Sequence, residues 1–507
     1  MLGCRAGLRH EGPGDHFRPY TGPMTSASPL PQKNQLVDLD VTGLAFGGKG
    51  VARIDDFVVF VRGAVPGDVV RARVLRRKKR YAEARVEELL KPSPDRCQAR
   101  CSAFGACGGC VWQDLAYESQ LKYKASQVRE SLEHLGGLTD FELRPILGMS
   151  SPWRYRNRAD FSIGMVDGEP VVGFRPAGRW DSVLPLSECH LLEKPIEAVR
   201  ETVQDWLEEQ RIPGWDPRAG KGFARHLLAR SSQNGGELLV SLVTAGGGLT
   251  EGDDLVQRLR AAHPQLVGVA NAVNDGRAEL SAGLPFTVLW GRPFLLEKVA
   301  DSTFKVSLNA FFQTNSQMTH QLCGLVAEVA GMLDDTQQVS TTVPDGPVIW
   351  DLFCGVGSIG LTLAHRAKAV LGIEAVPSAV EDAQENAHLG EVENAHFVEG
   401  DVAQILRQIT DGSHRLPEHL QIPDVIVVDP PRAGLSRKAV ARIGEVGAAS
   451  IVYVSCNPTT LAPDVAQLTE YGYRLEHVTP VDMFPHTPHV ECVASLKLAA
   501  PPALPQL

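Results

Sequence analysis

The chain has 507 residues and a formal net charge of −10 at pH 7, with 43% apolar and 22% charged residues. This length allows several domains with separate cores, and the composition is ordinary for a water-soluble protein. No apolar run approaches the roughly 18 residues of a membrane span, and the first residues lack the apolar core of a signal peptide. We therefore expect a cytoplasmic monomer that has no membrane partner.

Residues 1–34 are expected to form a disordered leader, because they are rich in Gly, Pro and His and show no periodicity. Met24 is an alternative start of translation, and the intact mass of the native protein would test this hypothesis. At the other end of the chain, residues 501–507 are expected to form a short tail.

Residues 35–93 contain short apolar runs separated by glycine-containing turns, a pattern typical of a small antiparallel β-barrel. The segment Arg71–Arg80, RARVLRRKKR, holds seven basic residues in ten. Such a patch attracts phosphate even on an acidic protein, so we favour contact with RNA. A charged edge strand that prevents aggregation is the alternative. The unit resembles the TRAM domain, an OB-like RNA-binding barrel.

Residues 94–310 begin with Cys97, Cys101, Cys107 and Cys110 in CQARCSAFGACGGC, and Cys189 follows in LSECHLL. In a reducing compartment, the ten cysteines of the chain do not indicate a disulfide framework. Three thiols spaced C-x5-C-x2-C and one distant thiol suit zinc or an iron–sulfur cluster. Zinc is the simpler interpretation from thiolate number alone, and five cysteines compete for four places.

The rest of this central unit alternates a helix, near residues 115–136, with strand-like segments, which predicts an α+β domain. Trp153–Arg158, WRYRNR, interleaves aromatic and basic residues, as suits base stacking and phosphate contact. A partly exposed strand at the start of a hairpin is the alternative. A second basic cluster, Lys221–Arg230, is a weaker candidate for the same groove.

Residues 311–500 alternate apolar strands with helices, which predicts a parallel sheet covered on both faces. The stretch Val348–Glu374 contains a strand, a G-x-G-x-x-G turn, a helix and a second strand that ends in Glu374. Such a turn lets the backbone approach a nucleoside cofactor, and the acid reaches its ribose. The turn alone does not distinguish NAD from S-adenosylmethionine (SAM), but the strands that follow favour SAM. Upstream, Gln313 and Asn315 suit helix capping and ligand contact equally.

Several polar residues follow the ends of these strands, where ligands bind in such sheets. Asp429 lies in DPPR and Cys456 in SCNP, and Glu491 begins the final strand. Only the short loop PHTPHVE precedes that strand, so the last two strands should pair antiparallel. Glu491 is therefore predicted to lie on the same rim as Cys456.

A thiol and a carboxylate beside a methyl donor suit methylation at C5 of uracil. A thiolate that adds to C6 makes C5 nucleophilic, and a base must remove the C5 proton before the thiol can leave. Cys456 fits the nucleophile and Glu491 the base. Taken singly, Cys456 is also compatible with a buried apolar role and Glu491 with a surface charge.

The motifs CSAFGACGGC, FFQTN, DLFCGVGSIG, VVDPPRAG, YVSCNPTTLAPD and HTPHVECVASL resemble the RNA uracil-C5 methyltransferase family over residues 35–498. The resemblance implies a Rossmann-like SAM domain, catalysis by Cys456 and Glu491, and a target base taken out of its stack. It also implies a [4Fe-4S] cluster on Cys101, Cys107, Cys110 and Cys189. The implied cofactor contacts are Gln313, Phe353, Gly355, Gly357, Ser358, Glu374, Asp401 and Asp429. Ser358 stands where many members have asparagine.

Three other functions compete with this interpretation: an amino-methyltransferase acting on adenine, an NAD oxidoreductase, and a non-catalytic iron–sulfur RNA-binding protein. The first would also carry a D/N-P-P motif but has no use for Cys456. The RNA substrate is not named by the motifs. The barrel and the cluster both occur in the ribosomal-RNA branch of the family that this chain resembles, so the resemblance favours ribosomal RNA and leaves tRNA open.

Overall fold

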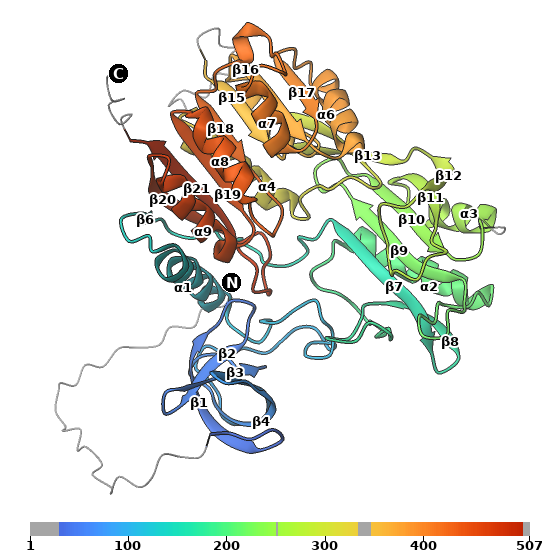
Figure 1. Cartoon of the computed structure of the whole chain (residues 1–507). Helices are drawn as coiled ribbons and strands as arrows, with labels where there is room; N and C mark the ends of the chain where they lie inside the picture. Colours follow the sequence, from blue (N-terminus) through green and yellow to red (C-terminus); the bar gives the residue numbers. More distant parts are fainter. Residues whose placement is uncertain (1–29, 250–251, 333–345, 500–507) are drawn as a thin grey trace, which may run out of the picture.

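The computed structural model describes residues 30–249, 252–332 and 346–499. The predicted leader up to residue 29, Met24 and the tail 501–507 lie outside these ranges. Figure 1 shows three sheet-containing regions in chain order: a barrel, a central sheet and a larger C-terminal sheet. No helix within the described ranges combines the length and apolar character needed to span a membrane.

The first region is a closed five-stranded barrel in the order β1-β2-β3-β5-β4. Alternating residues of each strand point inward, for example Val59 and Val61, which are fully buried. Contrary to a fully antiparallel barrel, β3 and β5 pair in parallel. The strands are β1 (Leu36–Leu44), β2 (Gly50–Ile54), β3 (Phe57–Arg62), β4 (Val69–Arg77) and β5 (Tyr81–Lys91).

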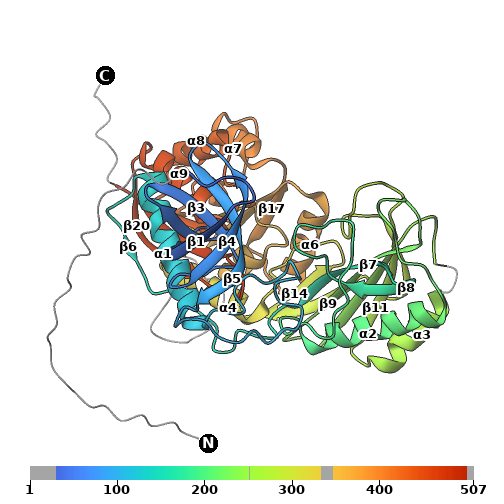
Figure 2. The same ribbon diagram turned by 90° about the horizontal axis from the view of Figure 1, so that it is seen from below.

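The central region is a six-stranded sheet in the order β12-β11-β10-β9-β7-β8. Two helices cover one of its faces, as Figure 2 shows from below. A separate hairpin, β13–β14, leads toward the last domain. The elements are β7 (Arg158–Val166), β8 (Glu169–Gly173), α2 (Lys194–Glu209), β9 (Ala224–Ser231), β10 (Leu238–Thr244), α3 (Gly252–Ala262), β11 (Leu266–Val273), β12 (Phe286–Gly291), β13 (Phe294–Val299) and β14 (Ser302–Ser307).

The second basic cluster, Lys221–Arg230, is wrong as a surface from Ala224 onward, because those residues belong to the buried strand β9; Lys221 lies before the strand and is exposed. Arg225, His226 and Arg230 expose 1%, 4% and 3% of their surface. The Arg225 guanidinium donates to the carbonyls of Asn274, Gly276 and Ala278 and to the carboxylate of Glu279. Alternation of basic and apolar residues does not reveal such internal partners, which are about fifty residues away in sequence.

The C-terminal region is an eight-stranded sheet in the order β17-β16-β15-β18-β19-β21-β20-β6. Strands β15–β19 are parallel, and β21 is antiparallel to both β19 and β20, as predicted. The strands are β15 (Val348–Leu352), β16 (Ala369–Glu374), β17 (Ala395–Glu399), β18 (Val425–Val428), β19 (Ser450–Ser455), β20 (Tyr473–Val481) and β21 (Glu491–Leu498). The helices are α4 (Ser316–Val329), α5 (Ser358–Ala364), α6 (Pro377–Leu389), α7 (Val402–Thr410), η1 (Glu418–Leu420), α8 (Arg437–Val446) and α9 (Pro458–Thr469).

Helix α1 (Tyr117–Gly136) and the short strand β6 (Glu142–Leu143) lie on this last sheet, although they precede the central sheet in sequence. Val128 and Leu132 of α1 belong to the same apolar core as Leu461 and Val465 of α9. Strand β6 extends the sheet beside β20. The expected division at residues 94–310 therefore differs from the packing, because α1 buries its apolar side against a helix more than 300 residues away in sequence.

Candidate active site

The turn after β15 has the geometry of a ligand-binding loop. Gly355 and Gly357 adopt φ of +56° and +81°, which side chains disfavour. A Cβ on Gly355 would meet no atom within 4 Å, so the backbone there faces open space. Gly360 is close to β15 instead: its N–H donates to Asp351 Oδ2 at 2.8 Å. Phe353 is also at positive φ (64°), a conformation that is strained for a residue with a side chain and that is found most often at functional sites.

Glu374, at the end of β16, holds this loop in place. Its carboxylate accepts hydrogen bonds from the N–H of Gly355 at 3.0 Å and of Val376 at 2.9 Å. Ser358 is the first residue of α5, and Asp401 is the N-cap of α7, where it accepts from Gln404 N at 3.0 Å. All three residues therefore stand at the carboxyl-end rim of the sheet, where a nucleoside binds.

Asp429, directly after β18, is a largely enclosed carboxylate. Burial raises its pKa to about 7. Within the described residues, no side-chain hydrogen bond of Asp429 is found, so a cationic ligand would compensate its charge. Together with the open space beside Gly355, this environment fits SAM, which carries both an ammonium and a sulfonium.

Gln313 and Asn315, in the segment before α4, have different environments. Asn315 is a structural cap: its Oδ1 accepts from Met318 N at 3.1 Å and its Nδ2 donates to Met483 O at 3.0 Å. It is fully buried. Gln313 is half-buried, and its carbonyl accepts from Asn157 Nδ2 at 3.1 Å, which leaves its side chain available for a ligand.

Cys456 and Glu491 are brought together by the pairing of β19 with β21. The register joins Ser455 to Cys492, so that Cys456 and Glu491 are the next residues at the same end. Cys456 is half-buried, and Glu491 is 3% exposed. The sequence prediction that both lie on one rim is confirmed by this register.

The rim favours protonated side chains. Burial, followed by the charges of Glu491 and Asp429, raises the pKa of Cys456 to about 12. Burial, followed by Asp429, raises the pKa of Glu491 to about 8. Arg432 opposes both shifts, and its guanidinium lies 3.0 Å from His489 Nδ1. Arg432 is thus the cation that favours the thiolate form of Cys456.

The loop before Glu491 is fixed by residues that the sequence did not single out. Lys124 of α1 pairs with Asp482 at 2.5 Å, and both side chains are fully buried. Gln120 accepts from His486 N, and the N–H groups of Val111 and Trp112 donate to His486 O. These contacts span more than 350 residues of sequence, and only the unusual loop PHTPHVE pointed toward them.

Four of the five clustered cysteines gather in space. Burial raises the pKa of Cys110 to about 12, and the thiols of Cys189, Cys107 and Cys101 are near enough to raise it as well. Cys97 has other neighbours: burial and the charges of Asp114 and Glu118 raise its pKa. Cys97 is therefore the outlying thiol, as the family resemblance implies.

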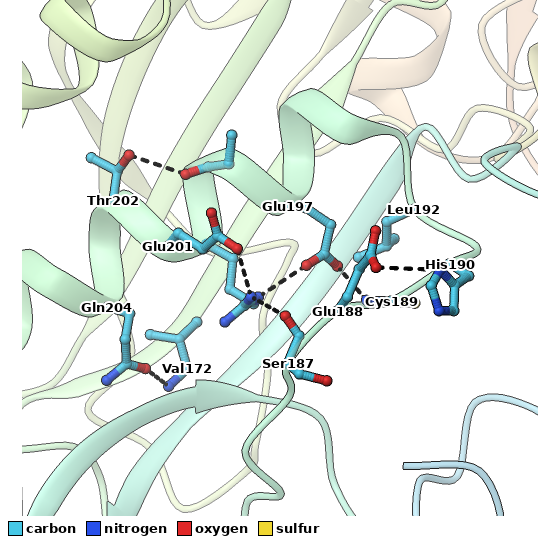
Figure 3. Close-up of polar contacts among 12 residues, drawn as sticks. Val172, Ser187, Glu188, Cys189, His190, Leu192, Glu197, Glu201, Thr202 and Gln204 are labelled. Carbon is cyan, nitrogen blue, oxygen red and sulfur yellow. Dashed lines mark hydrogen bonds and ion pairs between the residues drawn. The ribbon is translucent and has the colours of Figure 1, made fainter. Parts of the chain in front are cut away.

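The surroundings of these four thiols supply hydrogen bonds. Gln113 Nε2 donates to Cys110 Sγ at 3.2 Å, and Gly109 N donates to Cys107 Sγ at 3.4 Å. Figure 3 shows Cys189, whose N–H donates to Glu197 at 3.1 Å. Within the described ranges, no group of three or more His, Cys, Asp or Glu side chains is arranged to hold a metal ion. The four thiols therefore have the donor chemistry of a metal site, but the described part of the chain does not arrange them as one.

The two remaining candidate RNA surfaces differ in exposure. Arg71 pairs with Asp38 and Glu88, and Arg73 pairs with Glu87. The tip of the hairpin, residues 76–80, is exposed and makes no ion pair with any described residue. In WRYRNR, Tyr155 is buried, and the ring of Trp153 stacks on His486 with centroids 3.9 Å apart. That motif serves mainly as packing between domains.

Comparison with known proteins agrees with this geometry. Residues 296–498 match the family model tRNA (Uracil-5-)-methyltransferase, and residues 32–86 match the TRAM domain. An RNA methyltransferase of Halalkalibacterium halodurans is 36% identical over 92% of this chain and 98% of its own length. One of Chlorobaculum tepidum is 34% identical over 92% and 97%, respectively.

A solved structure has the same overall fold. It is Pyrococcus abyssi tRNA (uracil-54, C5)-methyltransferase in complex with S-adenosyl-L-homocysteine, with 29% identity and a TM-score of 0.71. The match covers 90% of this chain and 99% of that one.

Proposed function

The chain belongs to the RNA uracil-5-methyltransferase family, and from that premise we propose that it methylates one specific uridine through a covalent bond between Cys456 and C6 of the base. Membership makes it an RNA (uracil-C5-)-methyltransferase that uses SAM. The oxidoreductase, amino-methyltransferase and non-catalytic interpretations are therefore set aside.

The observation that carries the proposal is the pairing of Ser455 with Cys492, after which Cys456 and Glu491 are the next residues at the same end of the two strands. Two strands that pair in this register place a nucleophile and a carboxylate side by side. The charge of Glu491 is among the causes that raise the pKa of Cys456, which supports their proximity. Within the described ranges, the side chains of Cys456 and Glu491 make no hydrogen bond or ion pair that would explain their enclosure at a strand end.

When bound, SAM supplies an electrophilic methyl group on a sulfonium. In the proposed binding mode, Gly355 and Gly357 leave room for the cofactor backbone, and Glu374 accepts from the ribose hydroxyls. Asp429 compensates a positive charge, while Gln313, Phe353, Ser358 and Asp401 line the rest of the site. After accepting from the N–H groups of Gly355 and Val376, the Glu374 carboxylate retains free lone pairs on its oxygens, which are sufficient to accept from the ribose hydroxyls.

In the proposed mechanism, the thiolate of Cys456 forms a bond to C6, which places the ring's electron pair on C5. After C5 has been methylated, the carboxylate of Glu491 accepts the C5 proton, and the bond between sulfur and C6 breaks to restore the double bond. Arg432 stabilises the thiolate before attack. The buried rim excludes water, which strengthens each of these charge interactions.

For the substrate, we propose a uridine in tRNA first and ribosomal RNA second. The sequence favoured ribosomal RNA because a barrel and a cysteine cluster occur together. The P. abyssi protein is named a tRNA (uracil-54, C5)-methyltransferase, and its match covers 90% of this chain. This relative is the more direct support, so we place tRNA first.

The test is to follow covalent adducts with RNA in three proteins. Wild type incubated with SAM and tRNA or ribosomal RNA transcripts containing 5-fluorouridine should give an adduct that survives denaturing electrophoresis, because fluorine cannot leave as a proton. Cys456→Ala should bind SAM and RNA but form no adduct. Glu491→Gln should accumulate a methylated adduct with ordinary RNA.

The readouts separate the parts of the proposal. Absence of an adduct in wild type, while 5-methyluridine is still produced, would overturn covalent catalysis. Normal turnover by Glu491→Gln would move the base elsewhere, with Asp429 next. Nucleoside mass spectrometry on tRNA and ribosomal RNA from a deletion strain identifies the substrate, and loss of 5-methyluridine only from ribosomal RNA would overturn the tRNA assignment.

We also propose that Cys101, Cys107, Cys110 and Cys189 hold a [4Fe-4S] cluster. What supports this is the gathering of these four thiols apart from Cys97, together with N–H donors aimed at sulfur. Zinc fits the same donors. The reaction moves no electrons, so the metal centre would act as a structural link between the barrel, the central sheet and the catalytic loop.

A further inference from the structure

Two cavities lie away from the reaction rim. One, of about 360 Å³, lies against β17 and contains none of the residues proposed to bind SAM. The other, of about 290 Å³, lies in the central region beside β7. Its walls carry Trp180, Trp215, Arg175, Arg179 and Arg218. The first cavity has one arginine, Arg415, beside Phe397, whereas the second combines two indole rings with three guanidinium groups. No motif had singled out the second cavity.

Trp180 is the feature that requires an explanation. Of the seven tryptophans, all of which are described, it alone is exposed, at 58%. Trp215 is half-buried, and the guanidinium of Arg225 covers one of its faces, 4.3 Å from the ring centroid. An exposed indole next to a second, supported indole offers stacking surfaces that folding itself does not need.

Two of the three acids that line this cavity are paired with cations, and the third, Asp216, accepts from the N–H groups of Arg218 and Ala219. Glu279 accepts from Trp215 Nε1 at 3.1 Å, from Arg225 at 2.8 Å and from Arg175 at 2.6 Å. Asp181 pairs with Arg179 and Arg218. The cavity therefore presents indole faces and guanidinium planes rather than free carboxylates, and this combination recognises a nucleobase by stacking.

The cavity is preformed by close contact of its loops with β7. A Cβ on Gly214 would lie 2.3 Å from the carbonyl oxygen of Gly164, and a Cβ on Gly164 would lie 2.8 Å from Val183. Both loops therefore rest directly on the strand. Arg175 is fixed from below, because its Nε donates to Ser162 Oγ at 3.0 Å. A ligand would meet a rigid wall and pay little to order it.

The cavity is also connected to the reaction rim through the cysteine segment. The loop that carries Trp180 pairs with that segment, with Ala177 N donating to Ala106 O at 2.9 Å and Gly108 N donating to Arg175 O at 3.3 Å. A few residues further on, Val111 and Trp112 hold the loop before Glu491. One continuous stretch of chain thus joins the two places.

We propose that this cavity, the Trp180 pocket, binds an unpaired nucleobase of the same RNA whose uridine is methylated at Cys456. The inference rests on the proposed function, since the ligand is the RNA substrate. The pocket takes a second, non-reacting base and holds the strand in register while the target uridine reaches the rim. Its size, near the lower end for ligand pockets, suits a single base rather than a duplex.

The test compares Trp180→Ala with Trp290→Ala as a matched control. Trp290 is another tryptophan of the central region with an arginine over its ring, Arg260 at 4.6 Å, but it lies outside the pocket. With unmodified tRNA or ribosomal RNA transcripts, whichever wild type methylates, Trp180→Ala should raise KM for RNA ~10-fold, as expected for one lost base stack. Its kcat and its KM for SAM should stay unchanged, and Trp290→Ala should match wild type.

A direct readout is ultraviolet crosslinking of the wild-type protein to that transcript. The crosslink should appear on the tryptic peptide that begins at Trp180. Excess AMP should not reduce this crosslink, because the pocket is proposed to bind a base of the RNA strand and not a free nucleotide. A KM for Trp180→Ala within twofold of wild type, or an equal rise in Trp290→Ala, would overturn the inference. If wild type methylates neither RNA, the proposed function fails instead, so the two failures are distinguishable.

Discussion

At the scale of single residues, burial changes the protonation of Glu491, the proposed base. It lies at the first position of β21, 3% exposed, beside Asp429 and Cys456. Burial disfavours the charged form of each of these three groups, and the charge of Asp429 acts in the same direction on Glu491 and Cys456. The free enzyme therefore holds its thiol in the unreactive form, and the cations of Arg432 and the bound cofactor must supply the compensating charge.

The raised pKa of Glu491 predicts a pH-dependent difference in stability between wild type and Glu491→Gln. The folded pKa of about 8 lies above the ordinary value of 4.5, so the native state binds more protons between these values. Stability of wild type is accordingly lost as pH rises from about 4.5 to 8. Glu491→Gln has no charge to bury, so its stability relative to wild type should increase over that window and level off above pH 8.

Urea unfolding of both apoproteins at several pH values measures this difference. Buried acids whose pKa does not depend on Glu491, such as Asp351, affect both proteins equally and cancel in the comparison. A difference that stays constant from pH 5 to 8 would show that Glu491 titrates as an exposed carboxylate does.

At the scale of elements, α1 holds in place the loop between β20 and β21, which ends at Glu491 and is called the catalytic loop here. Its Lys124 donates to Asp482 and to the carbonyl of Phe484, and its Tyr117 donates to Asp482 at 2.9 Å. Burial lowers the pKa of Lys124, and Asp482 opposes that shift. A helix that is first in sequence thereby fixes the loop that ends in the proposed base.

Lys124→Met should destabilise the protein by ~3–5 kcal/mol, because it leaves the buried carboxylate of Asp482 without a counter-ion. Arg129→Met, on the exposed side of the same helix, removes an i,i+4 pair with Glu133 and should cost less than ~1 kcal/mol. Denaturant unfolding of the two variants makes the comparison. Equal losses of stability in the two variants would mean that the pair of Lys124 with Asp482 contributes no more than a surface ion pair.

The basic hairpin between β4 and β5 is the element that carries the prediction for RNA affinity. Replacing Arg76, Arg77, Lys78 and Lys79 by Ala should weaken RNA binding and reduce its salt dependence, since fewer counter-ions are released. Filter binding at 50–200 mM salt measures both. Replacing Arg437 and Lys438, exposed on α8, serves as the control for lost charge. An unchanged slope in the hairpin variant would assign the basic run to solubility.

At the scale of the whole molecule, the cysteine segment lies where three regions meet. Arg96 pairs with Asp68 next to the barrel, Cys107 bridges to Pro176 of the central region, and Trp112 reaches the catalytic loop. A bound metal centre would therefore fix the barrel and the central sheet relative to the last domain. That is the kind of role expected of a cluster with no redox step to perform.

Cys107→Ser should lose bound metal, whereas Cys97→Ser should retain it, because only the first thiol lies among the four that gather. Anaerobic purification with iron, zinc and sulfide analysis measures this, and a brown protein distinguishes iron–sulfur from colourless zinc. Loss of metal from Cys97→Ser with retention in Cys101→Ser would overturn the assignment of ligands.

Much of the fold was accessible from the sequence, because local patterns determine it. The glycine turn after Leu352 and the apolar strands around it predicted the parallel sheet, since backbone bending and strand burial depend on nearby residues. The short loop before Glu491 predicted an antiparallel last strand, and from that the meeting of Glu491 with Cys456 followed. This part of the candidate site needed only topology.

Tertiary structure decided what depends on partners far away in sequence. The basic residues of β9 became internal, because Glu279 and three carbonyls about fifty residues away receive Arg225. Helix α1 joined the last sheet because its apolar side matches α9. Trp180 became one wall of a pocket only through loops that meet on β7. Burial and pairing are properties of the packed chain, so the sequence determined which elements form and their order, while packing determined which charges face solvent.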